Sequence, residues 1–177
     1  MNQHKVLALL CRVLLSEMGV GVDVLTESVI AVIRGSLGNQ EYFALTSLEN
    51  ADGDVRPSLI VLLVSMTSER QPFKLRCAVF YCFLSYLFDN EFAKAKVIDT
   101  LLPSAQPEPS ANSIGTSGAL ICQAISSGEA IQSWFGCVSL LHCVLDVDHL
   151  KEQLLRVQLT VAVNETTGLL QHISSIL

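Results

Sequence analysis

The segment from Phe73 to Phe88 constrains the fold of this chain more than any other, because apolar residues occupy nearly every side of it. Its apolar residues follow the period of an α-helix, and Pro72 suits the position at which such a helix starts. These apolar residues are Leu75, Val79, Phe80, Phe83, Leu84 and Leu87. A helix that is apolar all round must be covered on more than one side. The chain therefore needs several further elements packed around this helix.

Most of the remaining chain also shows the helical period, and the alternation typical of strands never persists. Residues 49–56 are polar, contain Gly53 and are expected to form a loop. The other expected helices are His4–Glu17, Asp23–Arg34, Gln40–Leu45, Pro57–Thr67, Glu91–Leu102, Thr116–Ile125, Glu129–Leu145, His149–Val163 and Gly168–Leu177. This pattern predicts an all-α fold of about nine helices, arranged as an armadillo-like or HEAT-like solenoid in which each repeat packs on its neighbours.

A change in composition marks one long connection within this helical chain. Pro103, Pro107 and Pro109 fall in a stretch that is also rich in Ser, and these residues disfavour helix. We therefore predict that residues 1–177 belong to one armadillo-like domain. Residues 1–102 and 116–177 are expected to be helical, and residues 103–115 are expected to form a Pro/Ser-rich loop.

Two of the expected helices differ in the faces that they present. In the helix at 129–145, the small residues Ser133, Gly136 and Ser139 permit close approach of a neighbour. The same helix carries an apolar stripe of Ile131, Trp134, Val138, Leu141 and Leu145, so we expect both faces to pack. The helix at 149–163 has a solvent face, on which Glu152 and Arg156 are expected to pair at i, i+4.

The charge of the chain limits its partners. The net charge is −6 and the isoelectric point is about 5.1, so there is no basic stripe that could neutralise a phosphate backbone. We therefore exclude nucleic acid as a partner. The most apolar run, at residues 77–88, is shorter than the roughly 20 residues that span a bilayer. No transmembrane span is expected, and membrane association is expected only through partners.

No pattern in the sequence predicts catalysis, a cofactor or a metal site. Phosphate-binding glycine loops, hydrolase elbows and paired Cys/His ligand spacings are missing from it. His142 and Cys143 are adjacent, so on a helix they point about 100° apart and cannot share a site. Glu49, Asp52 and Asp54 crowd one loop without EF-hand spacing. The six cysteines lie in apolar helical patterns and are interpreted as reduced core thiols of a cytosolic protein.

Several segments resemble one known family. Residues 69–83 read ERQPFKLRCAVFYCF and are similar to a stretch in the globular head of the Golgi vesicle-tethering factors called general vesicular transport factors. Residues 32–35, 39–43, 100–104 and 151–159 are similar to that head in the same order. The resemblance extends over residues 5–177 and includes two long, specific motifs. It identifies the chain as the last part of an armadillo-like head.

The resemblance also implies a cellular role. Members of that family tether vesicles before fusion in traffic from the endoplasmic reticulum to the Golgi and within the Golgi. They are homodimers with a coiled coil and an acidic tail, and they lie peripherally on the cytosolic face of Golgi and vesicle membranes. Their partners include a Rab GTPase, SNARE proteins and other tethers. This sequence contains neither the heptads nor the acidic tail. Binding that those parts carry is therefore not expected of residues 1–177.

Five charged residues are candidates for protein binding, and each has a structural alternative. Glu69, Arg70 and Arg76 lie in the longest matched motif, where the arginines could instead satisfy loop carbonyls or pair with Glu69. Glu152 and Arg156 could instead be a solvated helix face.

A general armadillo or HEAT adaptor remains an alternative to tethering, since a fold alone does not fix function. An exposed first helix, Val6 to Leu15, is expected to promote self-association.

Overall fold

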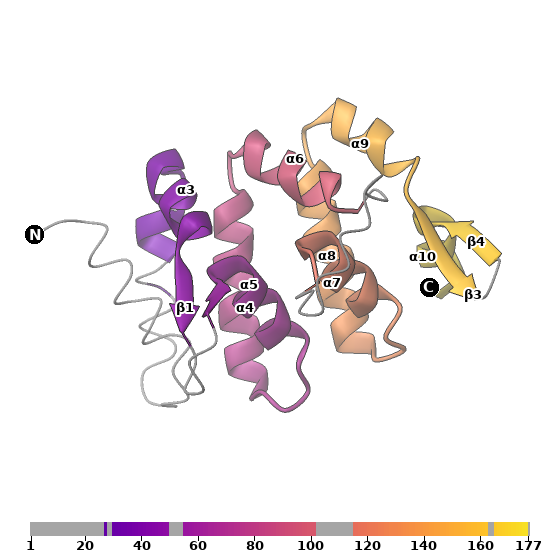
Figure 1. The fold of residues 1–177 in the computed structure, drawn as a ribbon, viewed down its shortest axis with the longest axis horizontal. Coiled ribbons are helices and arrows are strands. Elements are labelled where there is room, and N and C mark those ends of the chain that lie inside the picture. The colour runs from indigo at the N-terminus through magenta and orange to yellow at the C-terminus, as the bar shows by residue number, and fades with distance from the viewer. Residues whose placement is uncertain (1–26, 28–29, 50–54, 102–114, 163–164, 177) are drawn as a thin grey trace, which may run out of the picture. The chain divides into compact units, whose positions relative to one another are not determined.

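The computed structural model describes residues 27, 30–49, 55–101, 115–162 and 165–176. These residues are mostly helical (Figure 1), so the prediction of a predominantly helical chain is confirmed. The helices are α3 (Leu37–Leu45), α4 (Ser58–Thr67), α5 (Phe73–Leu87), α6 (Glu91–Asp99), α7 (Ser117–Ile125), α8 (Ala130–Val144), α9 (Asp148–Leu154) and α10 (Leu169–Ile176). The helix predicted at His4–Glu17, most of Asp23–Arg34 and most of the loop at 103–115 lie outside the described residues.

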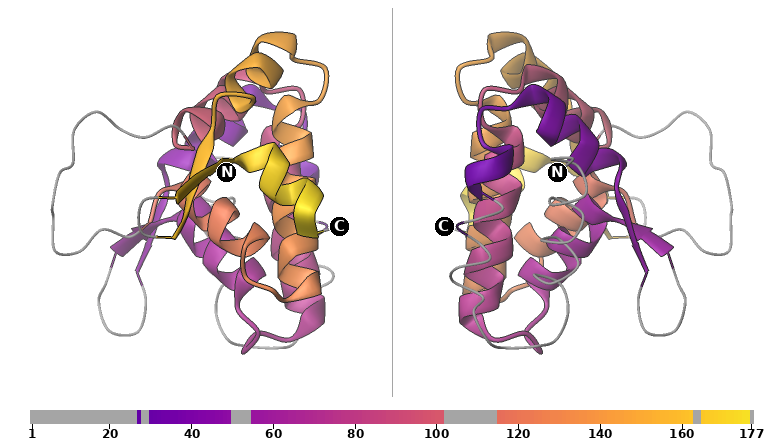
Figure 2. Two further views of the ribbon diagram at one scale, coloured as in Figure 1. Left: turned by 90° about the vertical axis from the view of Figure 1, so that its right-hand side faces the viewer. Right: turned by 90° about the vertical axis from the view of Figure 1, so that its left-hand side faces the viewer.

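Contacts divide the chain into two compact units, Met1–Asn90 and Glu91–Leu177. The first contains α3, then a connection, then α4 packed against α5 (Figures 1 and 2). The second begins in the same way, with α6, a connection, and α7 packed against α8. It continues with α9 and α10, which are again separated by a connection. Each unit therefore contains a short helix that is followed by a packed pair.

The helices begin and end where local chemistry allows. Pro72 precedes α5, and Thr116 precedes α7 with its side chain accepting a hydrogen bond from the backbone N–H of Ala119. The carboxylate of Glu129 accepts two such bonds at the start of α8. After α5 and after α8 the chain turns through Asp89 (φ +49°) and Asp146 (φ +61°). These left-handed residues end both long helices, since a helix cannot continue through them.

Two β-hairpins interrupt the helical order. Strands β1 (Ser47–Glu49) and β2 (Val55–Pro57) pair antiparallel, where the sequence had predicted only a loop. Strands β3 (Gln158–Ala162) and β4 (Glu165–Gly168) also pair antiparallel, with an irregularity between Thr160 and Ala162. The predicted helix His149–Val163 is therefore wrong beyond Leu154.

The helix α9 ends early because its last turn tightens. The backbone N–H groups of Arg156 and Val157 bond back three residues, to the carbonyls of Gln153 and Leu154, at 3.0 and 3.1 Å. The residues that follow are rich in β-branched side chains, which fit a pleated strand better than a helix. The partner strand β4 supplies two further threonines, Thr166 and Thr167. Apolar spacing alone had favoured a longer helix.

The close approach of α7 and α8 confirms the role predicted for small residues. A Cβ atom placed on Gly136 would lie 2.8 Å from Cγ1 of Ile125 and 3.1 Å from the carbonyl oxygen of Ile121. Ser133 donates a hydrogen bond from Oγ to the carbonyl of Ile125 at 3.0 Å, and Ser139 is fully buried. The two backbones can therefore meet more closely than larger residues would allow.

Candidate protein-interaction surfaces

The structure makes Arg76 part of the packing within the first unit. Its residue surface is only 6% exposed, and its Nε donates to the carbonyl oxygen of Met66 at 2.9 Å. Met66 lies in the last turn of α4, where carbonyls have no partner within the helix. Arg76 thereby joins the end of α4 to α5. This geometry supports the structural alternative for Arg76.

The other predicted binding residues are exposed. Glu69 and Arg70 lie in the turn that leads into α5, and Glu152 lies on α9. Arg156 is exposed beyond the last residue of α9, and no ion pair joins it to Glu152 among the described contacts. The predicted i, i+4 pair therefore does not form. Binding by these four residues stays a prediction.

Gln40, from another matched segment, also has a structural role. It is fully buried, and its Nε2 donates to the carbonyls of Ser85 at 2.9 Å and Phe88 at 2.8 Å. Its Oε1 accepts a hydrogen bond from Nδ2 of Asn90 at 3.0 Å. These bonds attach α3 to the end of α5. Two of the matched motifs therefore contain residues that satisfy helix ends.

A first candidate surface is the apolar stripe of α8, which we call the α8 surface: Ile131, Trp134, Val138, Leu141 and Leu145. Trp134 and Leu141 are each 55% exposed, and Val138 is half-buried. The buried side of α8 consists instead of Phe135, Gly136, Ser139, Leu140 and Cys143. The expectation that both faces of this helix pack within the chain is therefore wrong. The stripe is open to solvent.

A hollow of about 470 Å³ adjoins the α8 surface. Trp134 and Cys137 of α8 line it together with His172 and Ile176 of α10. The Oγ of Ser126, which follows α7, lies 3.1 Å from Nε2 of His172 and so connects α7 to α10 beside the hollow. A half-exposed tryptophan next to a hollow is the arrangement in which bulky apolar side chains of a partner bind well.

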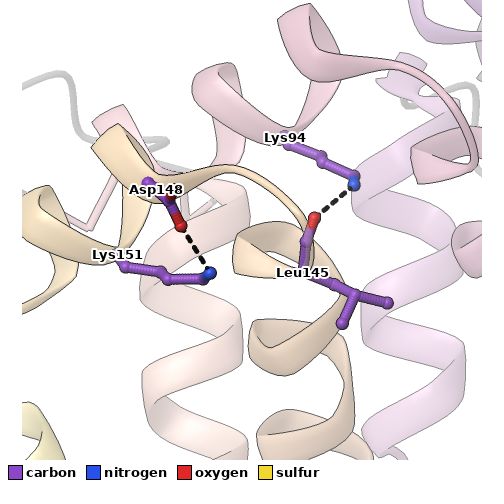
Figure 3. Close-up of polar contacts among 4 residues, drawn as sticks. All are labelled: Lys94, Leu145, Asp148 and Lys151. Atoms are coloured by element: carbon purple, nitrogen blue, oxygen red, sulfur yellow. Dashed lines mark hydrogen bonds and ion pairs between the residues drawn. The ribbon is translucent and has the colours of Figure 1, made fainter.

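The α8 surface has few charges around it. Helices α7, α8 and α10 contain no Asp, Glu, Lys or Arg. At the end of α8, Lys94 donates from Nζ to the carbonyl of Leu145 at 2.9 Å, and Lys151 contacts Asp148 at 2.7 Å (Figure 3). The hydrogen bond and the charge of Lys151 lower the pKa of the Asp148 carboxyl. The stripe itself is electrically neutral.

A second candidate surface lies on α5 in the first unit. Phe73 and Tyr81 are each 58% exposed, Phe88 is 37% exposed, and Cys77 and Leu84 are half-buried. We call these five residues the α5 surface. The guanidinium carbon of Arg34 lies 3.7 Å from the ring centroid of Phe88, which is a cation–π contact at the end of this stripe. Both units therefore present an exposed apolar stripe on their longest helix.

Two of the described cysteines have thiols that are unsuited to nucleophilic chemistry. Burial raises the pKa of Cys143 to about 12 and that of Cys122 to about 11, so both thiols stay protonated at neutral pH. Cys82 and Cys143 are buried as predicted for core thiols, Cys77, Cys122 and Cys137 are half-buried, and Cys11 lies outside the described residues. Within the described residues, no group of three or more His, Cys, Asp or Glu side chains is placed to hold a metal ion.

Comparison with known proteins identifies the family. A family model described as the head region of Uso1 / p115 like vesicle tethering protein matches residues 37–177. The chain belongs to this vesicle-tethering family. The matched range includes every helix from α3 to α10, so the α5 and α8 surfaces both lie in the Uso1/p115 head region. No described helix has the length and apolarity needed to cross a membrane.

Curated relatives support the same assignment. The general vesicular transport factor p115 of Homo sapiens is 41% identical over 181 residues, a range that includes 100% of this chain. The Rattus norvegicus protein of the same name has the same identity and coverage. The chain spans only 18% of the length of each of these relatives. The resemblance to the Golgi tethering family, predicted from the motifs, is confirmed.

The α8 surface was visible in the sequence but misinterpreted. At about 100° per residue, the centre of the stripe lies roughly 180° from the centre of the small residues Ser133, Gly136 and Ser139. Small residues mark where a neighbouring helix comes closest. An apolar stripe on the opposite side of the same helix is therefore the side most open to an external partner. This relation could have predicted the exposed surface of a Uso1/p115 head.

Proposed function

We propose that the chain is a protein-interaction segment of a vesicle-tethering factor, which docks vesicles before membrane fusion in ER-to-Golgi and intra-Golgi transport. The head-region match over residues 37–177 is the observation that carries the proposal. The exposed α5 and α8 surfaces support it, since half-exposed aromatic residues are typical anchors of protein interfaces.

The proposal includes an armadillo-like arrangement. The first unit and the start of the second share the order of a short helix, a connection and a packed helix pair. Repeats of this kind commonly stack into a solenoid. We propose that residues 1–177 are part of such a head domain. The family match favours tethering over a general armadillo or HEAT adaptor.

The partners follow from the family. We propose that the chain acts without catalysis, at the cytosolic face of Golgi and vesicle membranes, by contacting a Rab GTPase, SNARE proteins or other tethers. The longer family members are proposed to homodimerise through parts outside this chain. Attachment to membranes is then peripheral and depends on these protein contacts.

Binding to defined partners tests the proposal. The purified chain is immobilised and probed with recombinant Rab GTPases of the ER–Golgi route, loaded with GTP analogue or GDP, and with cytosolic SNARE domains. We expect saturable binding of at least one of them. The double variant Trp134→Ala, Leu141→Ala should weaken a contact made through the α8 surface, because these side chains supply its exposed apolar area.

A matched control and a transport assay complete the test. Leu155→Ala removes an equally apolar side chain that is 71% exposed at the end of α9, and it should leave binding unchanged. Excess chain added to semi-intact cells should slow cargo transport from the endoplasmic reticulum to the Golgi, because it competes with the full-length tether. Absence of both binding and inhibition would refute the tethering role.

A further inference from the structure

We infer that the α5 surface, formed by Phe73, Cys77, Tyr81, Leu84 and Phe88, binds an amphipathic helix of a partner protein whose apolar face is flanked by acidic residues. The inference rests on the proposed function, because it names the partner chemistry of one surface of an interaction segment. Its first support is the shape of the surface. The five residues follow helical spacing along about 22 Å of α5.

A stripe of this length matches the apolar face of another helix. A helix that lies along α5 would place apolar residues at i, i+4, i+7 and i+11 against it, which is the usual mode of helix recognition. Phe73 and Tyr81 provide exposed aromatic area near the start and middle of the stripe, and Phe88 does so at its end. An extended peptide would instead use unpaired backbone groups of a sheet edge, which a helix face does not offer.

The charges around the α5 surface indicate which sign of charge the partner should carry. The whole chain has a net charge of −6, yet the exposed charge on α5 is the cation Lys74, and the helix has no acidic residue. Arg70 precedes the stripe and is exposed, and the guanidinium of Arg34 lies over Phe88 at its other end. Exposed cations therefore stand at both ends of the apolar stripe.

Acidic residues also lie near the two ends of the stripe, but they do not pair with the exposed arginines there. Glu69 and Asp89 flank the two ends, and Glu69 takes part in an interaction within the chain, as Lys74 does. Neither Arg34 nor Arg70 forms an ion pair with another described residue. The Arg34 guanidinium is held by the Phe88 ring, and its planar fork suits a carboxylate. Acidic flanks on the partner helix complement this arrangement.

An anionic membrane is the competing ligand and is less well matched. Recognition of anionic lipid by basic clusters typically uses about four to eight Lys or Arg residues together. The α5 surface has Arg34, Arg70 and Lys74, separated along the stripe, and the opposite side of α5 is buried against α4. Three separated cations are fewer than such a lipid site typically uses, whereas a partner helix can lie along the stripe.

A designed peptide pair tests the inference on the full chain. The probe is a fluorescein-labelled peptide of about 18 residues, long enough to form helix, with Leu at i, i+4, i+7 and i+11 and Glu at the flanking positions. A second peptide replaces every Glu with Lys. We expect the acidic peptide to bind, as measured by fluorescence anisotropy, and the basic peptide not to bind. Hydrogen exchange should slow in α5 and not in α8.

Reversing the charge of two arginines gives a second, more specific test. The variant Arg34→Glu, Arg70→Glu should weaken the acidic peptide by about tenfold, as two rim charges allow, and should now bind the basic peptide. Lys96→Glu, an exposed cation on α6, is the matched control and should change neither affinity. Circular dichroism checks that each variant folds.

The outcomes separate this inference from the proposed function. Equal binding of both peptides, protection outside α5, or unchanged affinity in the charge-reversed variant would overturn the inference. Tight binding to anionic vesicles that is lost in that variant, with no peptide binding, would assign the surface to lipid. The Rab and SNARE measurements use the α8 variants and are unaffected by either result.

Discussion

At the scale of single residues, polar side chains satisfy the ends of helices throughout the structure. Arg76 binds the carbonyl of Met66, Gln40 binds those of Ser85 and Phe88, and Lys94 binds that of Leu145. Each bond meets a carbonyl near the end of a helix, where intrahelical donors run out. Three different residue types do the same task. A comparison of residue identities therefore could not have revealed it.

Replacing Arg76 tests this role. Arg76→Met keeps most of the apolar stem but removes the donor to Met66, so we expect a loss of about 1–3 kcal/mol in the free energy of unfolding. Urea denaturation measures the difference. Arg70→Met, at an exposed position in the turn before α5, should change stability by less than about 0.5 kcal/mol. Equal losses in the two variants would argue against a structural role specific to Arg76.

The buried thiol of Cys143 predicts a pH dependence. Burial raises its pKa in the folded state to about 12 from the usual 9.0, so folding favours the protonated thiol. The stabilisation of the folded state by this preference is complete below pH 9.0 and is lost as the pH rises towards 12. The stability difference between the wild type and Cys143→Ala should stay constant to pH 9 and shrink above it. A difference that stays constant to pH 11, in urea titrations, would contradict the prediction.

At the scale of elements, two glycines differ in the space that their surroundings leave for a Cβ atom. Gly136→Ala should destabilise the chain by about 1–3 kcal/mol, because its Cβ would lie 2.8 Å from Ile125 and force α7 and α8 apart. Gly38→Ala, in α3, meets nothing within 4 Å and should stabilise by about 0.5–1 kcal/mol through helix propensity. Thermal melts of both variants measure the contrast. Stabilisation by Gly136→Ala would refute the close contact.

The helices could be predicted from the sequence because their apolar residues recur with the helical period, and some of them also have a local start signal. Pro72 and Thr116 mark starts that the structure places within one residue of the prediction. The hairpins could not be predicted in the same way. Residues 158–162 continue the apolar spacing of α9, and their pairing with 165–168 adds to the strand preference of their β-branched residues. Pairing between two segments is a tertiary effect, and the spacing of apolar residues within one segment does not reveal it.

The exposure of the α8 stripe was not predicted, for a related reason. The stripe on α8 reads as core because Trp134, Leu141 and Leu145 are apolar, yet the buried side of the helix is the one with Gly136 and Ser139. Hydrophobicity alone does not say which of two apolar faces is covered within the chain. In α8 the small residues Gly136 and Ser139 mark the covered face, and the prediction did not use this signal.

At the scale of the whole molecule, exposed apolar stripes and acidic charge act against each other. The α5 and α8 surfaces favour association, whereas a net charge of −6 makes two copies repel. Salt screens the repulsion, with a Debye length of about 30 Å at 0.01 M and about 8 Å at 0.15 M. We therefore predict that self-association, expected from the sequence, increases as salt is added. Multi-angle light scattering at constant protein concentration measures it.

Variants identify which apolar surface drives this association. Trp134→Ser, Leu141→Ser should reduce the mass at high salt if copies meet through α8, and Phe73→Ser, Tyr81→Ser should do so if they meet through α5. The segment Val6 to Leu15 lies outside the described residues. Substitutions within it test the prediction, made from the sequence, that this segment promotes self-association. Because all these changes conserve net charge, they leave the repulsive contribution untouched. A monomer at every salt concentration would show that neither surface is self-complementary, which leaves both free for partners of other kinds.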